Sequence, residues 1–259
     1  GRESPDGIHQ FIPPQDGYDL VLTIDHVIQY IAEREIERAV QRTGSERGAF
    51  IAMDPKTGEI LAWALYPKFD PNNYQDYPAT NRRNFAIADM YEPGSTFKIV
   101  TGSSALDAGV VTLNTPFFDS GELKIGGVTV HCWRAGGHGA QNFVTATENS
   151  CNPVFAILGA ELLGAEKFYE YITKFGFGKP TGVDFPGEAG GLVPVPGQVK
   201  FGEVARWANV GFGQGIAVTP LQLLQAAATI ANDGVALRPH FVREIRDKDG
   251  NLIKSFASQ

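Results

Sequence analysis

No run of hydrophobic residues in this 259-residue chain approaches the roughly 18–20 residues that a helix needs to span a bilayer, and no signal peptide opens the chain. A run of basic residues is also missing, and the net charge of −7 argues against a nucleic-acid-binding surface. Internal repeats and low-complexity segments are absent as well. The hydrophobic fraction of 43% and the charged fraction of 20% are those of an ordinary globular protein. These absences leave a mildly acidic globular chain, long enough for one large domain or two modest ones.

The first part of the chain predicts a strand, a helix and a hairpin. Residues 19–24 alternate apolar and polar side chains, as in a strand with one buried face. Asp25 is the predicted N-cap of a helix whose apolar residues recur until Gly44, with a charged face that we interpret as solvent-exposed. A hairpin follows, with arms at 48–54 and 59–66 around a turn that contains proline and glycine. This order indicates an α+β fold with an antiparallel sheet.

The rest of the chain predicts helices joined by long connections, as thirty glycines and sixteen prolines indicate. Thr219, Pro220 and Gln222 have the N-cap, N1 and N3 identities that begin a helix, and Gly234 ends it. Further expected segments are helices at 99–108, from near Thr145 to about 155 and at 166–175, a glycine- and proline-rich connection at 176–206, and two short strands within 241–256. A connection of that length usually serves function or mobility.

The stretch from Glu92 to Lys98 carries the clearest chemical signal. Pro93 and Gly94 interrupt the preceding structure, and Ser95 then stands where a helix begins. Residues three apart lie on one helical face, about 5–6 Å between Cβ atoms, so we expect Lys98 to reach the Ser95 hydroxyl. A desolvated, neutral lysine can take the serine proton, and the helix N-terminus offers N–H groups to an oxyanion. The simpler interpretation is a serine that only caps the helix, and S-x-x-K alone does not decide between the two.

A second serine lies about fifty-five residues further along the chain. Ser150 can relay a proton to a serine–lysine pair and Asn152 can hold a substrate amide, although S-x-N by itself is uninformative. With the other motifs, in their order and spacing, the chain resembles the transpeptidase domain of class B penicillin-binding proteins from Leu20 to about Pro239. The motifs that carry the resemblance are Leu22-Thr23-Ile24-Asp25, Thr57-Gly58-Glu59-Ile60-Leu61-Ala62, Glu92-Pro93-Gly94-Ser95-Thr96-Phe97-Lys98, His138-Gly139, Ser150-Cys151-Asn152, Thr181-Gly182-Val183-Asp184 and Gly213-Gln214-Gly215-Ile216-Ala217-Val218-Thr219-Pro220-Leu221-Gln222.

The resemblance implies the fold and its boundaries. We expect an antiparallel sheet flanked by helices, with an inserted, mostly helical subdomain at about 75–206. Residues 25–259 would belong to the transpeptidase domain, and 1–24 would be a linker or the end of a preceding region.

The family's third motif, K-T/S-G-T, does not follow the helix that begins at Thr219. Its lysine binds the carboxylate side of the substrate, and its strand supplies one N–H of the oxyanion hole. The segment Lys56-Thr57-Gly58 matches the first three residues of this motif, but it precedes Ser95 in the chain, and we interpret it as a hairpin turn only. The domain is therefore expected to be C-terminally incomplete, and the activity of this piece alone is in doubt.

The resemblance also implies a role for each motif residue in a peptidoglycan D,D-transpeptidase. Ser95 would be the nucleophile that attacks the D-alanyl-D-alanine carbonyl and is acylated by β-lactams, and Lys98 would be its base. Ser150 would assist proton transfer and Asn152 would contact bound substrate. The backbone N–H of Ser95 would form half of the oxyanion hole, and no cofactor is expected.

The partners implied by the resemblance are peptidoglycan stem peptides ending in D-Ala-D-Ala, β-lactams as covalent inhibitors, a glycosyltransferase and other wall-synthesis proteins, and no nucleic acid. The location implied is the extracytoplasmic face of the bacterial cell membrane, with an N-terminal anchoring helix that this chain does not contain. From the start at Gly1-Arg2-Glu3-Ser4 we expect the chain to be a fragment.

Cys132 and Cys151 leave three interpretations open. The first interpretation is two small free thiols, the usual state of cysteine. The second is a disulfide, which the oxidising side of a membrane permits. A Cys132–Cys151 bridge would pull on Ser150 and Asn152 and act as a redox switch, and this candidate redox pair resembles that of the sporulation-specific members of the class, the stage V sporulation protein D group. The third interpretation is zinc held by the two cysteines with His131 and His138. That spacing matches no standard ligand set, so no metal is expected.

Two rival functions remain at this point. A β-lactam sensor or serine β-lactamase would also use the Ser95–Lys98 pair, but the segment at Thr219 and the helix opening near Asp25 favour the transpeptidase, and the deacylation rate would separate them. The second rival function is a catalytically silent scaffold of a division or sporulation complex. This interpretation gains support only if the natural protein lacks the third motif.

Overall fold

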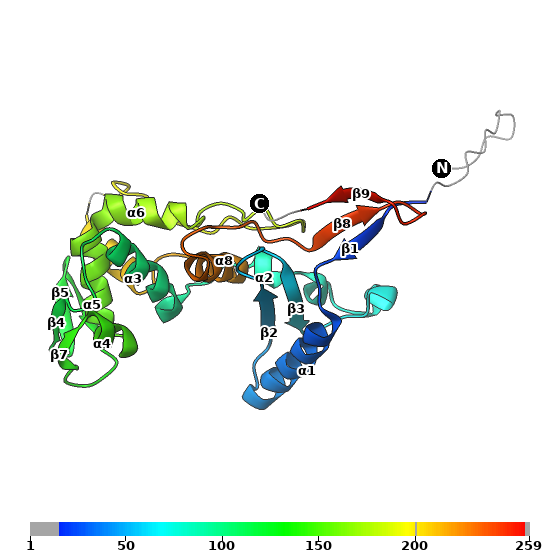
Figure 1. The fold of residues 1–259 in the computed structure, drawn as a ribbon. Coiled ribbons are helices and arrows are strands. Elements are labelled where there is room, and N and C mark those ends of the chain that lie inside the picture. Colours follow the sequence, from blue (N-terminus) through cyan, green and yellow to red (C-terminus); the bar gives the residue numbers. More distant parts are fainter. Residues whose placement is uncertain (1–15, 200, 257–259) are drawn as a thin grey trace, which may run out of the picture.

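The computed structural model describes residues 16–199 and 201–256, whose arrangement is shown in Figure 1. In chain order the strands and helices are β1 (Asp19–Leu22), α1 (His26–Thr43), β2 (Gly48–Met53), β3 (Ile60–Tyr66), α2 (Phe85–Ala88), α3 (Lys98–Asp107), β4 (Pro116–Asp119), β5 (Glu122–Ile125), β6 (Val128–His131), β7 (Gly139–Asn142), α4 (Phe143–Glu148), α5 (Asn152–Ile157), α6 (Gly164–Lys174), α7 (Glu203–Gly211), α8 (Pro220–Ala231), β8 (Val242–Arg246) and β9 (Leu252–Ser255). Short 3₁₀ turns cover Pro71–Asp76, Ala79–Arg82 and Gly94–Phe97, and a π-helical turn covers Leu158–Leu163.

The elements predicted for both ends of the described chain are present. Asp25 caps α1 with its carboxylate, and Gly44 ends the helix with a φ of 66°. β2 pairs antiparallel with β3, and β1, β8 and β9 form a second antiparallel sheet. Thr219 and Gln222 form the predicted capping box at the start of α8. The α+β class with antiparallel pairing is therefore confirmed, and Lys56 lies in the turn between β2 and β3, as predicted.

The largest hydrophobic core lies among α3, α5, α6 and α7. Phe97, Phe155, Phe168 and Trp207 are completely or almost completely buried, and the Phe168 ring lies 5.9 Å from that of Trp207. In Figure 1 this group of helices occupies one end of the molecule, while β1, β2, β3 and α1 lie at the other. α8 lies between them and packs against α2, α3 and β2. The turn that carries Ser95 is thus built on the edge of the larger core.

Three features differ from the sequence expectation. α7 begins at Glu203, inside the predicted connection 176–206, after Gly202 with a φ of 79°. The strands β4 to β7 form two small antiparallel pairs within the predicted helical subdomain, β4 with β7 and β5 with β6. Each strand has only four residues, too few for an alternating pattern to stand out. The helix expected from Thr145 is broken into α4 and α5, because Ser150 between them has a φ of 48°.

The predicted boundaries at 25–259, with a helical subdomain at 75–206, stay predictions. Residues 1–15 of the predicted linker lie outside the described residues, while 19–22 form β1 and pair with β8. Among the described residues, no helix is both long enough and apolar enough to cross a membrane.

Candidate active site

Ser95 lies exposed on the 3₁₀ turn Gly94–Phe97, which continues directly into α3. The turn is held from the other side by the segment after α7, because the Gly94 N–H donates to the Gly213 carbonyl at 2.9 Å. Two residues further, the Gly215 N–H donates to Glu92 Oε1 at 2.8 Å. A Cβ atom at Gly213 would lie 2.0 Å from the Gly94 carbonyl oxygen, so only glycine allows this approach. The predicted nucleophile is therefore positioned by a backbone contact with residues more than a hundred positions later in the chain.

Lys98 is buried at the start of α3 and contacts the second motif. Its Nζ donates to the Ser150 carbonyl at 2.7 Å, to Ser150 Oγ at 2.9 Å and to Asn152 Oδ1 at 2.7 Å. The same Nζ lies 5.3 Å from the centroid of the Phe155 ring. Three acceptors match the three protons of an ammonium group, so the charged lysine is fully hydrogen-bonded here.

The expected contact between Lys98 and Ser95 is not made. In the part of the chain that the structure describes, no hydrogen bond joins Ser95 Oγ to Lys98 Nζ. The spacing of three residues does place both at the start of one helix, but the Ser95 side chain faces solvent while the Lys98 side chain points inward to Ser150. Lys98 instead contacts the second motif, which the spacing argument did not consider.

Burial brings the pKa of Lys98 close to neutral pH. Desolvation lowers the pKa of Lys98 from its ordinary value of 10.5 to about 8. At pH 7 about a tenth of the molecules therefore carry an uncharged Lys98 amine, which can accept a proton. A buried lysine with a lowered pKa beside hydroxyl groups is a typical general base.

Ser150 and Asn152 are brought to Lys98 by the break between α4 and α5. Ser150 adopts a left-handed φ of 48°, a conformation that a residue with a Cβ rarely takes and that is often found at functional sites. The Trp133 indole N–H donates to the Asn149 carbonyl at 2.8 Å, and Asn152 Nδ2 donates to the His131 carbonyl at 3.4 Å. The end of β6 and the loop after it therefore support both sides of the Ser150 turn.

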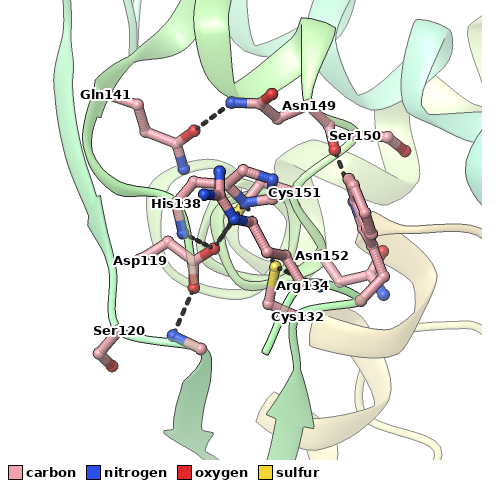
Figure 2. Close-up of polar contacts among 12 residues, drawn as sticks. Asp119, Ser120, Cys132, Arg134, His138, Gln141, Asn149, Ser150, Cys151 and Asn152 are labelled. Carbon is pink, nitrogen blue, oxygen red and sulfur yellow. Dashed lines mark hydrogen bonds and ion pairs between the residues drawn. The ribbon is translucent and has the colours of Figure 1, made fainter. Parts of the chain in front are cut away.

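Both cysteines are free thiols that lie around a buried carboxylate (Figure 2). Cys151 Sγ lies 3.4 Å from Asp119 Oδ2, and Cys132 Sγ lies 3.3 Å from His138 Nδ1, which is itself 3.0 Å from the same carboxylate oxygen. Of the four residues considered for zinc, the structure brings together Cys132, His138 and Cys151, whereas His131 is exposed on β6.

Asp119 is the residue that the sequence reasoning missed. It lies at the end of β4, thirteen residues before Cys132 in the chain and in no recognisable motif, so the sequence holds no signal that would have singled it out. Burial acts to raise the pKa of the Asp119 carboxyl, but the Cys132 thiol, the Gly121 N–H and His138 outweigh burial and hold the pKa well below its usual range. Burial also raises the pKa of the Cys151 thiol to about 11.

Taken together, the site offers an exposed hydroxyl at a helix start, a buried amine with a pKa near neutral, a second hydroxyl and a side-chain amide. A nucleophile, a base, a proton relay and a substrate-amide ligand are the groups that acyl transfer needs.

Comparison with known proteins finds a family model, curated relatives and solved structures that match the chain. Residues 48–258 match the family model of the penicillin binding protein transpeptidase domain. The chain is 41% identical over 247 residues to stage V sporulation protein D of Bacillus subtilis (strain 168), covering 94% of this chain and 38% of that protein. It is 35% identical over 250 residues to the peptidoglycan D,D-transpeptidase MrdA of Acinetobacter baumannii, covering 89% and 36%.

A solved structure shows the same fold. Penicillin binding protein 3 from Mycobacterium tuberculosis, complexed with ampicillin, superposes with a TM-score of 0.84 at 32% identity, covering 94% of this chain and 53% of that one. The chain thus spans less than two fifths of the length of the two curated relatives, and about half of the solved chain.

Proposed function

Because the chain belongs to the penicillin-binding protein transpeptidase domain family, we propose that it is the acyl-transfer part of a peptidoglycan D,D-transpeptidase, with Ser95 as the nucleophile. The observation that carries the proposal is the position of Lys98 Nζ, which is buried, lies 2.9 Å from Ser150 Oγ and has a pKa of about 8. An amine in this position can remove a hydroxyl proton and return it, which is the function that acyl transfer needs from a base.

The proposed reaction has two halves. Ser95 Oγ attacks the carbonyl carbon between the two D-alanines of a stem peptide. The step requires the Ser95 side chain, which faces solvent in this structure, to turn toward Lys98, whose neutral amine takes the proton. The C–N bond then breaks, and the terminal D-alanine leaves with a proton that passes from Lys98 through Ser150 Oγ. The amine of a second stem peptide then attacks the carbonyl carbon of the ester on Ser95 and loses a proton to the same groups. The ester C–O bond breaks as the new amide bond forms, and Ser95 Oγ takes back a proton from Lys98.

Asn152 is proposed to bind the substrate by its side-chain amide. Its Oδ1 accepts from Lys98 and its Nδ2 donates weakly to the His131 carbonyl, so both ends of the amide are oriented before substrate arrives. β-Lactams would enter the same position and acylate Ser95. The relative from M. tuberculosis in complex with ampicillin supports this part of the proposal.

The cellular setting is also a proposal. A peptidoglycan substrate would place the chain on the extracytoplasmic face of the bacterial cell membrane, and a membrane anchor and a glycosyltransferase partner are part of the same proposal. The names of the relatives, which include a sporulation protein and a peptidoglycan transpeptidase, support a role in wall synthesis.

Intact mass after incubation with benzylpenicillin tests the proposal. We expect an increase by one penicilloyl group, abolished in Ser95→Ala and retained in Ser103→Ala, a matched serine on α3 whose hydroxyl donates to the Ile99 carbonyl. Because the chain spans only part of its relatives, the measurement is made on this chain and on any longer form that contains it. No adduct on any form, or an adduct that survives Ser95→Ala, contradicts the proposal.

The rate at which the adduct is lost separates the related functions. A transpeptidase keeps the penicilloyl ester for a long time, whereas a serine β-lactamase hydrolyses it quickly. A silent scaffold forms no adduct, so the same experiment distinguishes all three.

A further inference from the structure

A cavity of about 500 Å³ lies at the end of the molecule that carries α1 and β3 (Figure 1). Four aromatic side chains from distant parts of the chain line it, those of Trp63, Phe69, Phe185 and Phe241. The ring of Phe241 lies 5.3 Å from that of Trp63 and 6.1 Å from that of Phe185. No residue of the candidate active site belongs to this lining. A mostly apolar cavity of this size is typical of a small-molecule site.

Two polar groups of the lining lack a hydrogen-bond partner. Among the described residues, the Trp63 indole N–H and the Asn84 side-chain oxygen are both buried without one, which costs stability. Gln29 also lines the cavity, but its side-chain amide is already bonded to the Trp63 backbone N–H at 2.7 Å and to the Trp63 carbonyl at 3.0 Å. Glu33 accepts from the same Gln29 amide at 2.8 Å. The indole N–H is therefore available to an acceptor that comes from outside the protein.

The Asn84 amide is adaptable. Asn84 is the N-cap residue of α2, but its side chain makes no capping hydrogen bond. Its amide can therefore rotate by half a turn without losing a cap, and it then presents its NH₂ group in place of its oxygen. In that orientation the lining offers two N–H donors to one ligand.

The polar part of the lining is mainly positive. It includes Lys68, Arg82 and Arg83, against a single acidic side chain. Lys68 is paired with Glu37 at 3.3 Å, and Arg83 with Asp89 at 2.7 Å. Arg82 is exposed and, within the described part of the chain, forms no ion pair. One cation of the lining is therefore left to attract an anion.

We propose that this cavity binds a small organic anion with a flat apolar body, of the aromatic carboxylate class. In the complex the aromatic lining packs against the body of the ligand. The Trp63 indole N–H and the rotated Asn84 amide donate to the carboxylate oxygens, and Arg82 balances the negative charge. The ligand thus supplies the partners that the buried polar groups lack. The proposal does not depend on acyl transfer at Ser95.

Titration of the ¹⁵N-labelled chain with 2-naphthoate tests the proposal, through the indole N–H signals of its three tryptophans. The indole N–H groups of Trp133 and Trp207 already have acceptors at 2.8 Å, so their signals are internal controls. We expect a saturable shift of the Trp63 signal alone, with a Kd of about 1 mM or lower. The neutral probe 2-naphthalenemethanol has the same rings without the charge, and it should bind at least about threefold more weakly.

Variants locate the site. Trp63→Phe removes the N–H but keeps an aromatic ring, and it should weaken 2-naphthoate binding about tenfold in ligand-detected NMR. Arg82→Gln should weaken binding about two- to fivefold. Arg42→Gln, at an exposed arginine in the last turn of α1, is the matched control and should leave the Kd unchanged.

The Trp63 signal is assigned by its loss in Trp63→Phe. Should that variant fail to fold, magnetisation transfer from the Phe241 ring, 5.3 Å away, assigns the signal in the unchanged chain. Three results would each overturn the proposal. They are the absence of a saturable Trp63 shift, equal shifts of all three indole signals, and a Kd for 2-naphthoate that neither Arg82→Gln nor replacement by the neutral alcohol raises.

Discussion

The backbone contact beneath Ser95 makes a quantitative prediction for two neighbouring glycines. Gly213 and Gly215 both have positive φ angles, +83° and +70°. An added Cβ at Gly213 would lie 2.0 Å from the Gly94 carbonyl oxygen, whereas one at Gly215 would meet nothing within 4 Å. Replacing each by alanine therefore separates the cost of the backbone conformation from the cost of the clash.

The two costs have different sizes. An alanine in the left-handed region costs about 1–2 kcal/mol, and this applies to both positions. Overpacking adds about 1–3 kcal/mol, and it applies only at Gly213, where the obstacle is backbone that cannot rotate away. We therefore expect Gly213→Ala to lower the free energy of unfolding by about 2–5 kcal/mol and Gly215→Ala by about 1–2 kcal/mol.

Urea denaturation of both variants measures the difference. The benzylpenicillin acylation rate gives a second readout, because Gly94 can relieve the clash only by moving the turn that carries Ser95. A displacement of about 1 Å is able to reduce the rate about 100-fold, so Gly213→Ala should acylate far more slowly than Gly215→Ala. Equal destabilisation by the two substitutions would refute the view that the Gly94–Gly213 contact positions the nucleophile.

Three further outcomes follow from individual groups. The acylation rate should rise about tenfold per pH unit up to about pH 8 and then level off, because the neutral Lys98 amine that accepts the proton becomes the major form above its pKa. Stopped-flow with a chromogenic β-lactam measures this rate, and a rate independent of pH between 6 and 9 would contradict the role of Lys98 as the base. Asp184→Asn should lower the free energy of unfolding by about 1–2 kcal/mol, because the Asp184 carboxylate accepts from the N–H groups of Phe241 at 2.8 Å and Val242 at 2.9 Å. The exposed Asp249, in the turn between β8 and β9, is its control, and Asp249→Asn should change that energy by less than about 0.5 kcal/mol in the same urea titration. Thr219→Ala should cost about 1 kcal/mol by loss of the α8 N-cap, seen as a lower Tm by calorimetry, and an unchanged Tm would contradict the assigned role of the cap.

Local signals in the sequence were sufficient for most element boundaries. The cap at Asp25, the capping box of Thr219 and Gln222 and the glycine at the end of α1 are each decided by hydrogen bonds within a few residues, and the structure confirms them. The same is true of the turn at Lys56, where the nearby proline and glycine strongly favour a turn over a continued strand. Such features depend on short-range geometry, which a single sequence displays directly.

The missed elements depend on contacts that are distant in the chain. α7 was hidden in a glycine- and proline-rich segment, and its helix is stabilised by packing against α5 and the π-helical turn after it, with Trp207 buried beside Phe168. The strands β4 to β7 are too short to show a period, and they exist because they pair with each other.

At the candidate site, too, the sequence predicts some features and the tertiary structure decides others. The sequence alone singled out Ser95, Lys98, Ser150 and Asn152 as candidates, because residue type and motif order carry that information, and their catalytic roles stay predictions. The tertiary structure decided that Lys98 Nζ contacts Ser150 and Asn152 rather than Ser95, and that burial brings its pKa near neutrality. It also decided that Asp119 joins the two cysteines. Burial and contacts between residues far apart in the chain exist only in the folded protein, so no local pattern could have shown them.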